Sequence, residues 1–216
     1  DVHEKIFCMS EADLYASSLK IKDLFKWIDR FYDSFDLKKA FQTAEKFDLD
    51  VTKRFKALSK GYQSIVKLTA ALALNVPYVI FDEPVLGLDA NHRELFYNLL
   101  LKNFEDNDQT IIIATHLIEE VANIIEEVVL IDKGKLLLQE NVDTLLERGY
   151  CVSGLAEEVD SYCKDKNVIG NDELGGLKLS YIIGEKTKLP QGSHLQITRM
   201  NLQKLFIKLT EKGGDE

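Results

Sequence analysis

The sequence predicts an α/β fold in which a partial parallel sheet with a helical subdomain is followed by a small C-terminal α+β appendage. Short runs of consecutive apolar residues, which are typical of buried parallel strands, alternate with segments whose apolar residues recur at helical spacing. Near Gly149 this alternation ends, and shorter elements punctuated by glycines begin. We therefore expect one domain over residues 1–149, with its helical subdomain at about 12–76, and an appendage over residues 150–216.

The predicted helices of the first domain share apolar residues spaced three and four apart. They lie at about 20–33, from Leu37 onward, at 62–74, after a cap at Asp89, and at 117–125. The predicted strands are short apolar runs at residues 5–9, 79–81, 110–115 and 128–131. We expect the last three of these strands to share the parallel sheet. Lys133-Gly134 predicts a hairpin turn into a strand at 135–139.

Composition narrows the class of protein. The formal net charge is −9, which argues against non-specific binding to nucleic acid or anionic lipid. Three cysteines without metal-ligand spacing argue against a disulfide framework or a zinc site and favour a reducing compartment. No run of about 18 apolar residues and no signal peptide occur. We expect a cytoplasmic protein that has no nucleic-acid partner.

Two carboxylates end an apolar strand in the segment Val79-Ile80-Phe81-Asp82-Glu83. Ligands of open α/β sheets bind at the C-terminal edge of the strands. In nucleotide hydrolases the first acid orders Mg²⁺ and its waters, and the next acid can polarise the attacking water. Asp82 is thus the candidate metal ligand and Glu83 the candidate general base. Alternatively, both side chains merely end a strand and meet solvent, and these five residues alone leave the two interpretations balanced.

Three neighbouring segments favour the functional interpretation. Upstream, at the start of a buried helix, is Leu58-Ser59-Lys60-Gly61-Tyr62-Gln63. Downstream are Gly87-Leu88-Asp89 and then His116, directly after a buried strand. In this order the segments resemble the signature sequence, Walker B strand, D-loop and switch histidine of the ATP-binding cassette (ABC) family, whose sheet is that of a P-loop NTPase. The resemblance covers residues of about 5–147 and includes a terminal hairpin at 129–135.

The resemblance implies roles for individual residues. Ser59, Lys60 and Gly61 would face the γ-phosphate bound by the other subunit of a dimer, through the hydroxyl and the N–H groups at a helix N-terminus. His116 would hydrogen-bond the γ-phosphate and the attacking water. Asp89 would both cap a helix and cross the dimer interface. Ser59 could instead be only a helix N-cap, and a lone histidine after a strand is more often a surface or core residue.

The chain departs from the family pattern at three positions. Lys60 replaces a glycine and Tyr62 the glutamine of the signature Leu-Ser-Gly-Gly-Gln, a variant similar to signatures of bacterial exporters. Glu11 stands where the family has the Q-loop glutamine. It has the same reach but cannot donate a hydrogen bond when ionised. Glu11 could bind Mg²⁺ or contact a membrane partner, or it could be an ordinary surface residue.

A Walker A loop, Gly-x-x-x-x-Gly-Lys-Ser/Thr, does not occur in the sequence. The backbone and lysine of this loop hold the nucleotide phosphates, and the family places it upstream of Walker B. We therefore expect the chain to be a fragment of a larger subunit, inactive by itself. Exposed strand edges would favour pairing of two fragments in a dimer other than the nucleotide sandwich.

The resemblance implies an ATP-hydrolysing, nucleotide-binding subunit of an ABC transporter, with ATP and Mg²⁺ as cofactors. It would power transport through separate transmembrane permease subunits, which helices near residues 12–57 would contact at the inner face of the cell membrane. A second ABC ATPase subunit would complete a homo- or heterodimer. Two alternatives stay open. One is a non-catalytic ABC-like module for dimerisation or regulation, and the other is a soluble ABC ATPase that acts on DNA or ribosomes.

Overall fold

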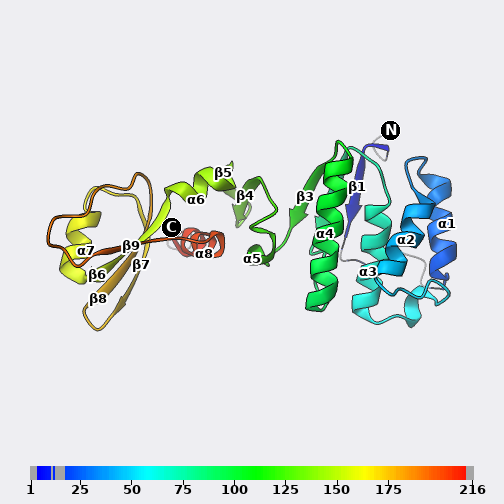
Figure 1. Cartoon of the computed structure of the whole chain (residues 1–216), viewed down its shortest axis with the longest axis horizontal. Helices are drawn as coiled ribbons and strands as arrows, with labels where there is room; N and C mark the ends of the chain where they lie inside the picture. The colour runs from blue at the N-terminus through cyan, green and yellow to red at the C-terminus, as the bar shows by residue number, and fades with distance from the viewer. Residues whose placement is uncertain (1–3, 11, 13–17, 213–216) are drawn as a thin grey trace. The chain divides into compact units, whose positions relative to one another are not determined.

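The computed structural model describes residues 4–10, 12 and 18–212. The chain divides into two compact units, Asp1–His116 and Leu117–Glu216 (Figure 1). The domain division that we expected at residue 149 stays a prediction. Within the described residues no helix has both the length and the apolar character that a membrane span needs.

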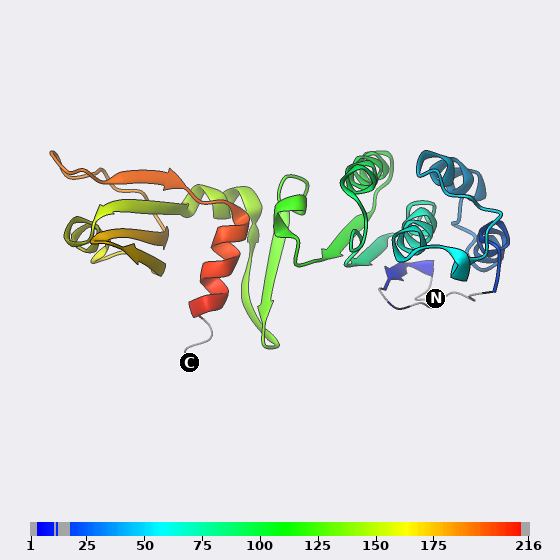
Figure 2. The same cartoon turned by 90° about the horizontal axis from the view of Figure 1, so that it is seen from below.

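A three-stranded parallel sheet lies at the centre of the first unit. Its strands are β1 (Ile6–Met9), β2 (Tyr78–Asp82) and β3 (Thr110–Ala114), with β2 in the middle. Alternate residues of β2 are buried, as in a strand with one covered face: Val79 is 2% exposed and Phe81 is 1% exposed, whereas Tyr78 is 46% exposed. Figure 2 shows helices α3 and α4 on one face of this sheet. The described residues cover only that face, although the apolar runs predicted burial on both.

Helices α1 and α3 begin and end within a few residues of their predicted positions, and α2 and α4 begin where the sequence predicted. The helices α1 to α4 each bury part of their apolar residues in the core, and α3 is buried almost all round over residues 65–72. Phe81 of the sheet packs edge-on against Phe96, with ring centroids 5.5 Å apart. The helices are α1 (Ile21–Phe31), α2 (Leu37–Lys46), the short 3-10 helix η2 (Phe55–Ala57), α3 (Lys60–Leu72) and α4 (Ala90–Asp106).

The second unit has a hairpin and a four-stranded antiparallel sheet in the order β7-β8-β6-β9. Its strands are β4 (Glu127–Asp132), β5 (Lys135–Asn141), β6 (Gly149–Leu155), β7 (Val168–Leu174), β8 (Leu177–Ile183) and β9 (Gln196–Arg199). Its helices are α5 (Ile118–Val121), α6 (Val142–Arg148), α7 (Ala156–Cys163) and α8 (Leu202–Lys212).

Two sequence predictions about this unit are wrong. We expected residues 128–131 in the parallel sheet, but β4 pairs antiparallel with β5, and β1 is the third parallel strand. The reason is the two-residue turn, where Lys133 (φ 46°) and Gly134 (φ 77°) have the positive φ angles of a type I′ hairpin. The helix that we predicted at 117–125 is also shorter, because α5 ends at Val121.

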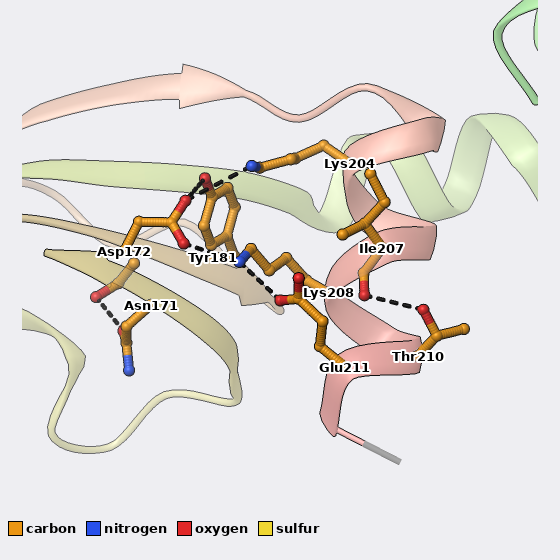
Figure 3. Close-up of polar contacts among 9 residues, drawn as sticks. Asn171, Asp172, Tyr181, Lys204, Ile207, Lys208, Thr210 and Glu211 are labelled. Carbon is orange, nitrogen blue, oxygen red and sulfur yellow. Dashed lines mark hydrogen bonds and ion pairs between the residues drawn. The ribbon is translucent and has the colours of Figure 1, made fainter. Parts of the chain in front are cut away.

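A polar network fastens α8 to the four-stranded sheet (Figure 3). Lys208 of α8 is 7% exposed, and its Nζ donates to Asp172 Oδ1 at 2.8 Å and to Glu211 Oε2 at 2.8 Å. The Tyr181 hydroxyl donates to the second oxygen of Asp172 at 2.6 Å. Because the buried ammonium has two carboxylate partners, its desolvation is offset. Next to this network lies the apolar core of the unit, which includes Leu205 at 1% exposure.

Candidate active site

The candidate site is built around Glu83, the first residue after the central strand β2. The Glu83 backbone N–H donates to the Ala114 carbonyl at 2.9 Å, so this residue still pairs with the end of β3. Its φ angle is 46°, in the left-handed region. A residue with a side chain costs about 1–3 kcal/mol in such a conformation, and this strain is common at functional sites. The strained backbone holds the Glu83 carboxylate at the C-terminal edge of the sheet.

Both oxygens of the Glu83 carboxylate accept hydrogen bonds from the end of β3. Thr115 Oγ1 donates to Oε2 at 3.0 Å, and the His116 backbone N–H donates to Oε1 at 3.1 Å. The ring Nδ1 of His116 lies 2.8 Å from Oε1. Because a carboxylate only accepts, this contact requires a proton on Nδ1. The structure thus brings together Glu83 and His116, the two residues that the sequence singled out, and adds Thr115, which it did not.

The electrostatics of Glu83 keep its carboxylate in the ionised form. Partial burial raises the pKa of this carboxyl, but the hydrogen bonds from His116 and Thr115 and the charge of His116 outweigh that effect. Its pKa therefore lies below the ordinary value. The side chain is 21% exposed and the His116 ring 65%, so water can approach both. The carboxylate is ionised at neutral pH and can act as a base.

Asp82 is the last residue of β2 and is half-buried, with Ala114 opposite it in the neighbouring strand. The described residues include no group of three or more side chains that could together hold a metal ion. Mg²⁺ is usually held by one or two carboxylates, its own waters and substrate phosphates. Asp82 fits that mode as a single protein ligand. Glu11, our other candidate metal ligand, lies outside the described residues.

A second cluster forms where the start of α3 meets the loop after β2. Ser59 caps α3, and its hydroxyl accepts the Tyr62 N–H at 3.4 Å, which confirms the N-cap expected of this residue. A Cβ atom on Gly61 would lie 2.8 Å from the Gly87 carbonyl oxygen, closer than real Cβ contacts. Only glycine at position 61 allows this approach. The signature-like and D-loop-like segments, with Lys60 exposed between Ser59 and Gly61, therefore touch within one chain.

Asp89 caps α4 as predicted, and its carboxylate also contacts the ring of His92. Its Oδ1 accepts the His92 N–H at 3.0 Å, and its Oδ2 lies 2.8 Å from His92 Nδ1. The His92 ring packs edge-on against Tyr62, with centroids 5.8 Å apart. His92 had no role in the sequence interpretation, although an Asp and a His three residues apart at a helix start are a usable signal. Through its contacts with Tyr62 and Asp89, His92 connects the start of α3 with the start of α4.

Lys67 is a further residue that the sequence interpretation missed. It lies in the buried stretch of α3 and is 6% exposed. Its ammonium donates to the carbonyl oxygens of Ser10 at 3.3 Å and Ala12 at 3.0 Å. A lysine inside an otherwise apolar helix was the available signal, because a buried ammonium needs partners. Lys67 ties α3 to the residues on both sides of Glu11.

Comparisons with known sequences identify the chain's relatives. The chain is 40% identical over 80 residues to the energy-coupling factor transporter ATP-binding protein EcfA2 of Mycoplasmoides gallisepticum, covering 37% of this chain and 25% of that protein. It is 28% identical over 161 residues to EcfA2 of Bacillus thuringiensis, covering 74% and 49%. It is 22% identical over 175 residues to the ABC transporter ATP-binding protein YtrB of Bacillus subtilis, covering 81% and 60%. The chain thus spans a quarter of the first relative's length, about half of the second's and 60% of the third's.

Solved structures support the fold. An ATP-binding subunit of an ABC transporter matches with a TM-score of 0.58 at 19% identity, covering 67% of this chain and 62% of that one. An ATP-binding cassette solved as a dimer with ADP and Pi matches with a TM-score of 0.56 at 23% identity, covering 64% and 63%. These likenesses show the cassette fold.

The family model that matches is described as "AAA domain, putative AbiEii toxin, Type IV TA system" and covers residues 8–122. That range is more than half of the chain and contains both clusters described above. The chain therefore belongs to this AAA-domain family, and its homologues are ATP-binding proteins of ABC transporters.

Proposed function

We propose that this chain belongs to an ATP-hydrolysing, nucleotide-binding subunit of an ABC transporter of the exporter-like kind. The observation that carries the proposal is the arrangement at Glu83. A strained backbone places its carboxylate at the edge of a central parallel strand, and Thr115 and His116 hold both carboxylate oxygens. The relatives, which are named as ATP-binding proteins of transporters, support the same proposal.

In the proposed reaction Glu83 is the general base. Its ionised carboxylate accepts a proton from a water molecule while the water oxygen attacks the γ-phosphorus and the bond to the β-phosphate oxygen breaks, which yields ADP and phosphate. His116 keeps the carboxylate in place and offers its ring to the γ-phosphate. Asp82 would hold Mg²⁺, which when bound neutralises phosphate charge. Ser59, Lys60 and Gly61 present the positive end of α3 to phosphate.

The proposed partners follow from the position of these groups. The α3 N-terminus and Asp89 would face the nucleotide of a second ABC ATPase subunit. The structurally similar ATP-binding cassette that was solved as a dimer supports this arrangement. Transmembrane permease subunits would contact the helices near residues 12–57 at the cytoplasmic face of the membrane. Nucleic acid is not among the proposed partners, because the net charge of −9 disfavours it.

The test is Glu83→Gln in the full-length protein. Glutamine keeps the shape and removes the base, so we expect steady-state ATP turnover to fall by about 10²–10⁴-fold while ATP binding is retained. Glu105→Gln on the exposed surface of α4 removes the same charge and should leave turnover unchanged. Turnover of the Glu83 variant within threefold of wild type would exclude Glu83 as the base. A wild-type protein that turns over no faster than Glu83→Gln would favour the non-catalytic module instead.

A second expectation concerns the 216-residue chain by itself. It contains no Gly-x-x-x-x-Gly-Lys-Ser/Thr segment, and that loop provides most of the phosphate contacts in P-loop enzymes. We expect no tight binding of Mg-ATP and no hydrolysis by this chain alone. Calorimetric titration measures the binding directly, and a micromolar dissociation constant would contradict the expectation.

A further inference from the structure

Helices α2 and α4 of the first unit face each other across a cavity of about 270 Å³. Most of the side chains that line this cavity are polar, whereas neighbouring helices ordinarily face each other with apolar side chains. In Figure 2 α2 and α4 lie side by side, with α3 beneath them. Each helix contributes side chains from one face, because the spacing of the residues is helical. The polar lining on which the inference depends is Lys39, Thr43 and Lys46 of α2 and Lys102, Asn103 and Asp106 of α4.

Hydrogen bonds between buried polar side chains lead to two residues of the cavity lining, Asn103 and Lys39. Asn103 is 6% exposed, and its Oδ1 accepts a hydrogen bond from Lys39 Nζ. Its Nδ2 donates to Gln109 Oε1 at 3.2 Å. Gln109, which is 5% exposed, donates in turn to the Val76 carbonyl at 2.8 Å. Since each of these side chains bonds the next, the hydrogen bond to Asn103 holds the Lys39 ammonium in place in the lining of the cavity.

Positive charge predominates in the lining. Lys46 and Lys102 are exposed, and neither forms an ion pair within the part of the chain that the structure describes. Of the two lining carboxylates, Asp36 already accepts the Lys39 backbone N–H at 2.8 Å as the cap of α2. Three ammonium groups thus outnumber two carboxylates, Asp36 and Asp106, in a chain whose net charge is −9. The carboxylates of Asp36 and Asp106 act on Lys39, and the positive charge left over in the lining would favour a bound anion.

We propose that this cavity binds a small multivalent oxyanion of the phosphate class, with Lys46 and Lys102 at its sides and Lys39 beneath it. A lysine ammonium is a compact charge with three donors, which suits a tetrahedral oxyanion approached from several sides. Thr43, which is 5% exposed, also lines the cavity. The cavity is near the lower end of small-molecule sites, which measure about 300–1,000 Å³. The site does not involve Glu83, so it stands or fails independently of the proposed function.

The experiment uses the 216-residue chain and inorganic phosphate at constant ionic strength, followed by the ¹H–¹⁵N NMR signals of Thr43 and Asn103. We expect a saturable shift of both signals. Lys46→Gln combined with Lys102→Gln should raise the dissociation constant at least tenfold. Lys26→Gln combined with Lys56→Gln removes the same charge from exposed positions outside the cavity and should change it less than twofold. Asp106→Asn should lower the dissociation constant, because it removes a repelling carboxylate.

Four results would overturn the proposal, three from the phosphate titrations and one from a titration with malonate. The first is a shift that does not saturate, and the second is unchanged affinity in the double lysine variant. The third is weaker binding in Asp106→Asn, which would indicate a site for cations. A parallel titration with malonate separates the possible sources of the anion, since tighter binding of malonate than of phosphate would assign the site to dicarboxylates and overturn the phosphate class. Asp106→Asn tests the proposal even if the double lysine variant does not fold.

Discussion

At the scale of single residues, the candidate base is defined by its hydrogen bonds as much as by its position. Glu83 accepts from Thr115 through one oxygen and from His116 through the other. These bonds fix the direction of the carboxylate and lower its pKa against the opposing effect of burial. Thr115 is therefore a positioning residue in our interpretation, because it acts on Glu83 and not on a substrate.

Thr115→Val tests that interpretation without requiring activity. Valine keeps the shape of threonine and removes the hydroxyl that donates to Glu83 Oε2 at 3.0 Å. We expect the pKa of Glu83 to rise toward its ordinary value in the variant, as followed by carboxyl ¹³C NMR titration of the 216-residue chain. Thr115→Ser keeps the donor and should keep the low pKa, and Thr110→Val at the start of β3 serves as the control. An unchanged pKa in Thr115→Val would show that the hydroxyl does not stabilise the carboxylate.

At the scale of elements, the spacing of apolar residues predicted the bounds of a helix or strand best where the element buries one face or is buried on all sides. α1, α3 and β2 lie close to their predicted bounds, because apolar residues at helical spacing or in a short run have few other ways to be buried. The hairpin of β4 and β5 was predicted from its turn, but β4 was wrongly placed in the parallel sheet as well, since consecutive apolar residues look alike in a parallel strand and in a hairpin strand. Val129 of β4 is 53% exposed, so an apolar side chain in this strand does not mean that its face of the strand is buried.

The candidate site was predictable to the same extent. Glu83 and His116 follow strands that pair, and residues at the ends of neighbouring parallel strands meet at one edge of a sheet. The partners Thr115 and His92 were not predicted, because their contacts depend on side-chain directions that spacing does not specify. Lys67 was missed for a related reason: its partners are carbonyl groups of residues 55 and 57 positions away in the chain.

The attachment of α8 should depend on pH through Asp172. The hydrogen bond from Lys208, followed by that from Tyr181, lowers the pKa of Asp172 from 3.8 to about 2. A carboxyl with a lowered pKa in the folded state stabilises the fold fully above its ordinary pKa, and this contribution is lost as the pH falls from about 4 to about 2. Because the Asp172 side chain is 47% exposed, solvent screening limits the contribution to about 1 kcal/mol or less.

Asp172→Asn removes this contribution, and urea unfolding followed by the methyl signals of Leu205 measures it. We expect the variant to be less stable than wild type near neutral pH by about 1 kcal/mol or less, and the difference to vanish near pH 2. Asp165→Asn, at an exposed position after α7, should show no such difference at any pH. A gap between wild type and Asp172→Asn that widens on acidification would contradict the sign of the linkage.

At the scale of the whole molecule, the two units of the chain have core residues of their own. Phe81 and Phe96 are in the core of the first unit. One of the apolar clusters of the second unit combines residues on both sides of position 149, among them Leu145 of α6 with Tyr181 and Leu205. The sequence placed α6 with the first domain, whereas this cluster gives α6 a packing partner in the appendage. The two divisions predict different responses to a cavity at Leu145.

Leu145→Ala in the 216-residue chain distinguishes the two divisions. Leu145 is 0% exposed, so truncation should cost about 2–5 kcal/mol. The single tryptophan, Trp27, lies in α1 and its fluorescence reports on the first unit, while the Leu205 methyl signals report on the second. We expect Leu145→Ala to lower the urea midpoint seen at Leu205 and to leave the Trp27 midpoint unchanged. Leu68→Ala in α3, also at a buried position, should do the reverse. If Leu145→Ala instead moves the Trp27 midpoint alone, α6 belongs with the first domain and the boundary lies at residue 149, and if both midpoints move together, the chain unfolds as one cooperative unit.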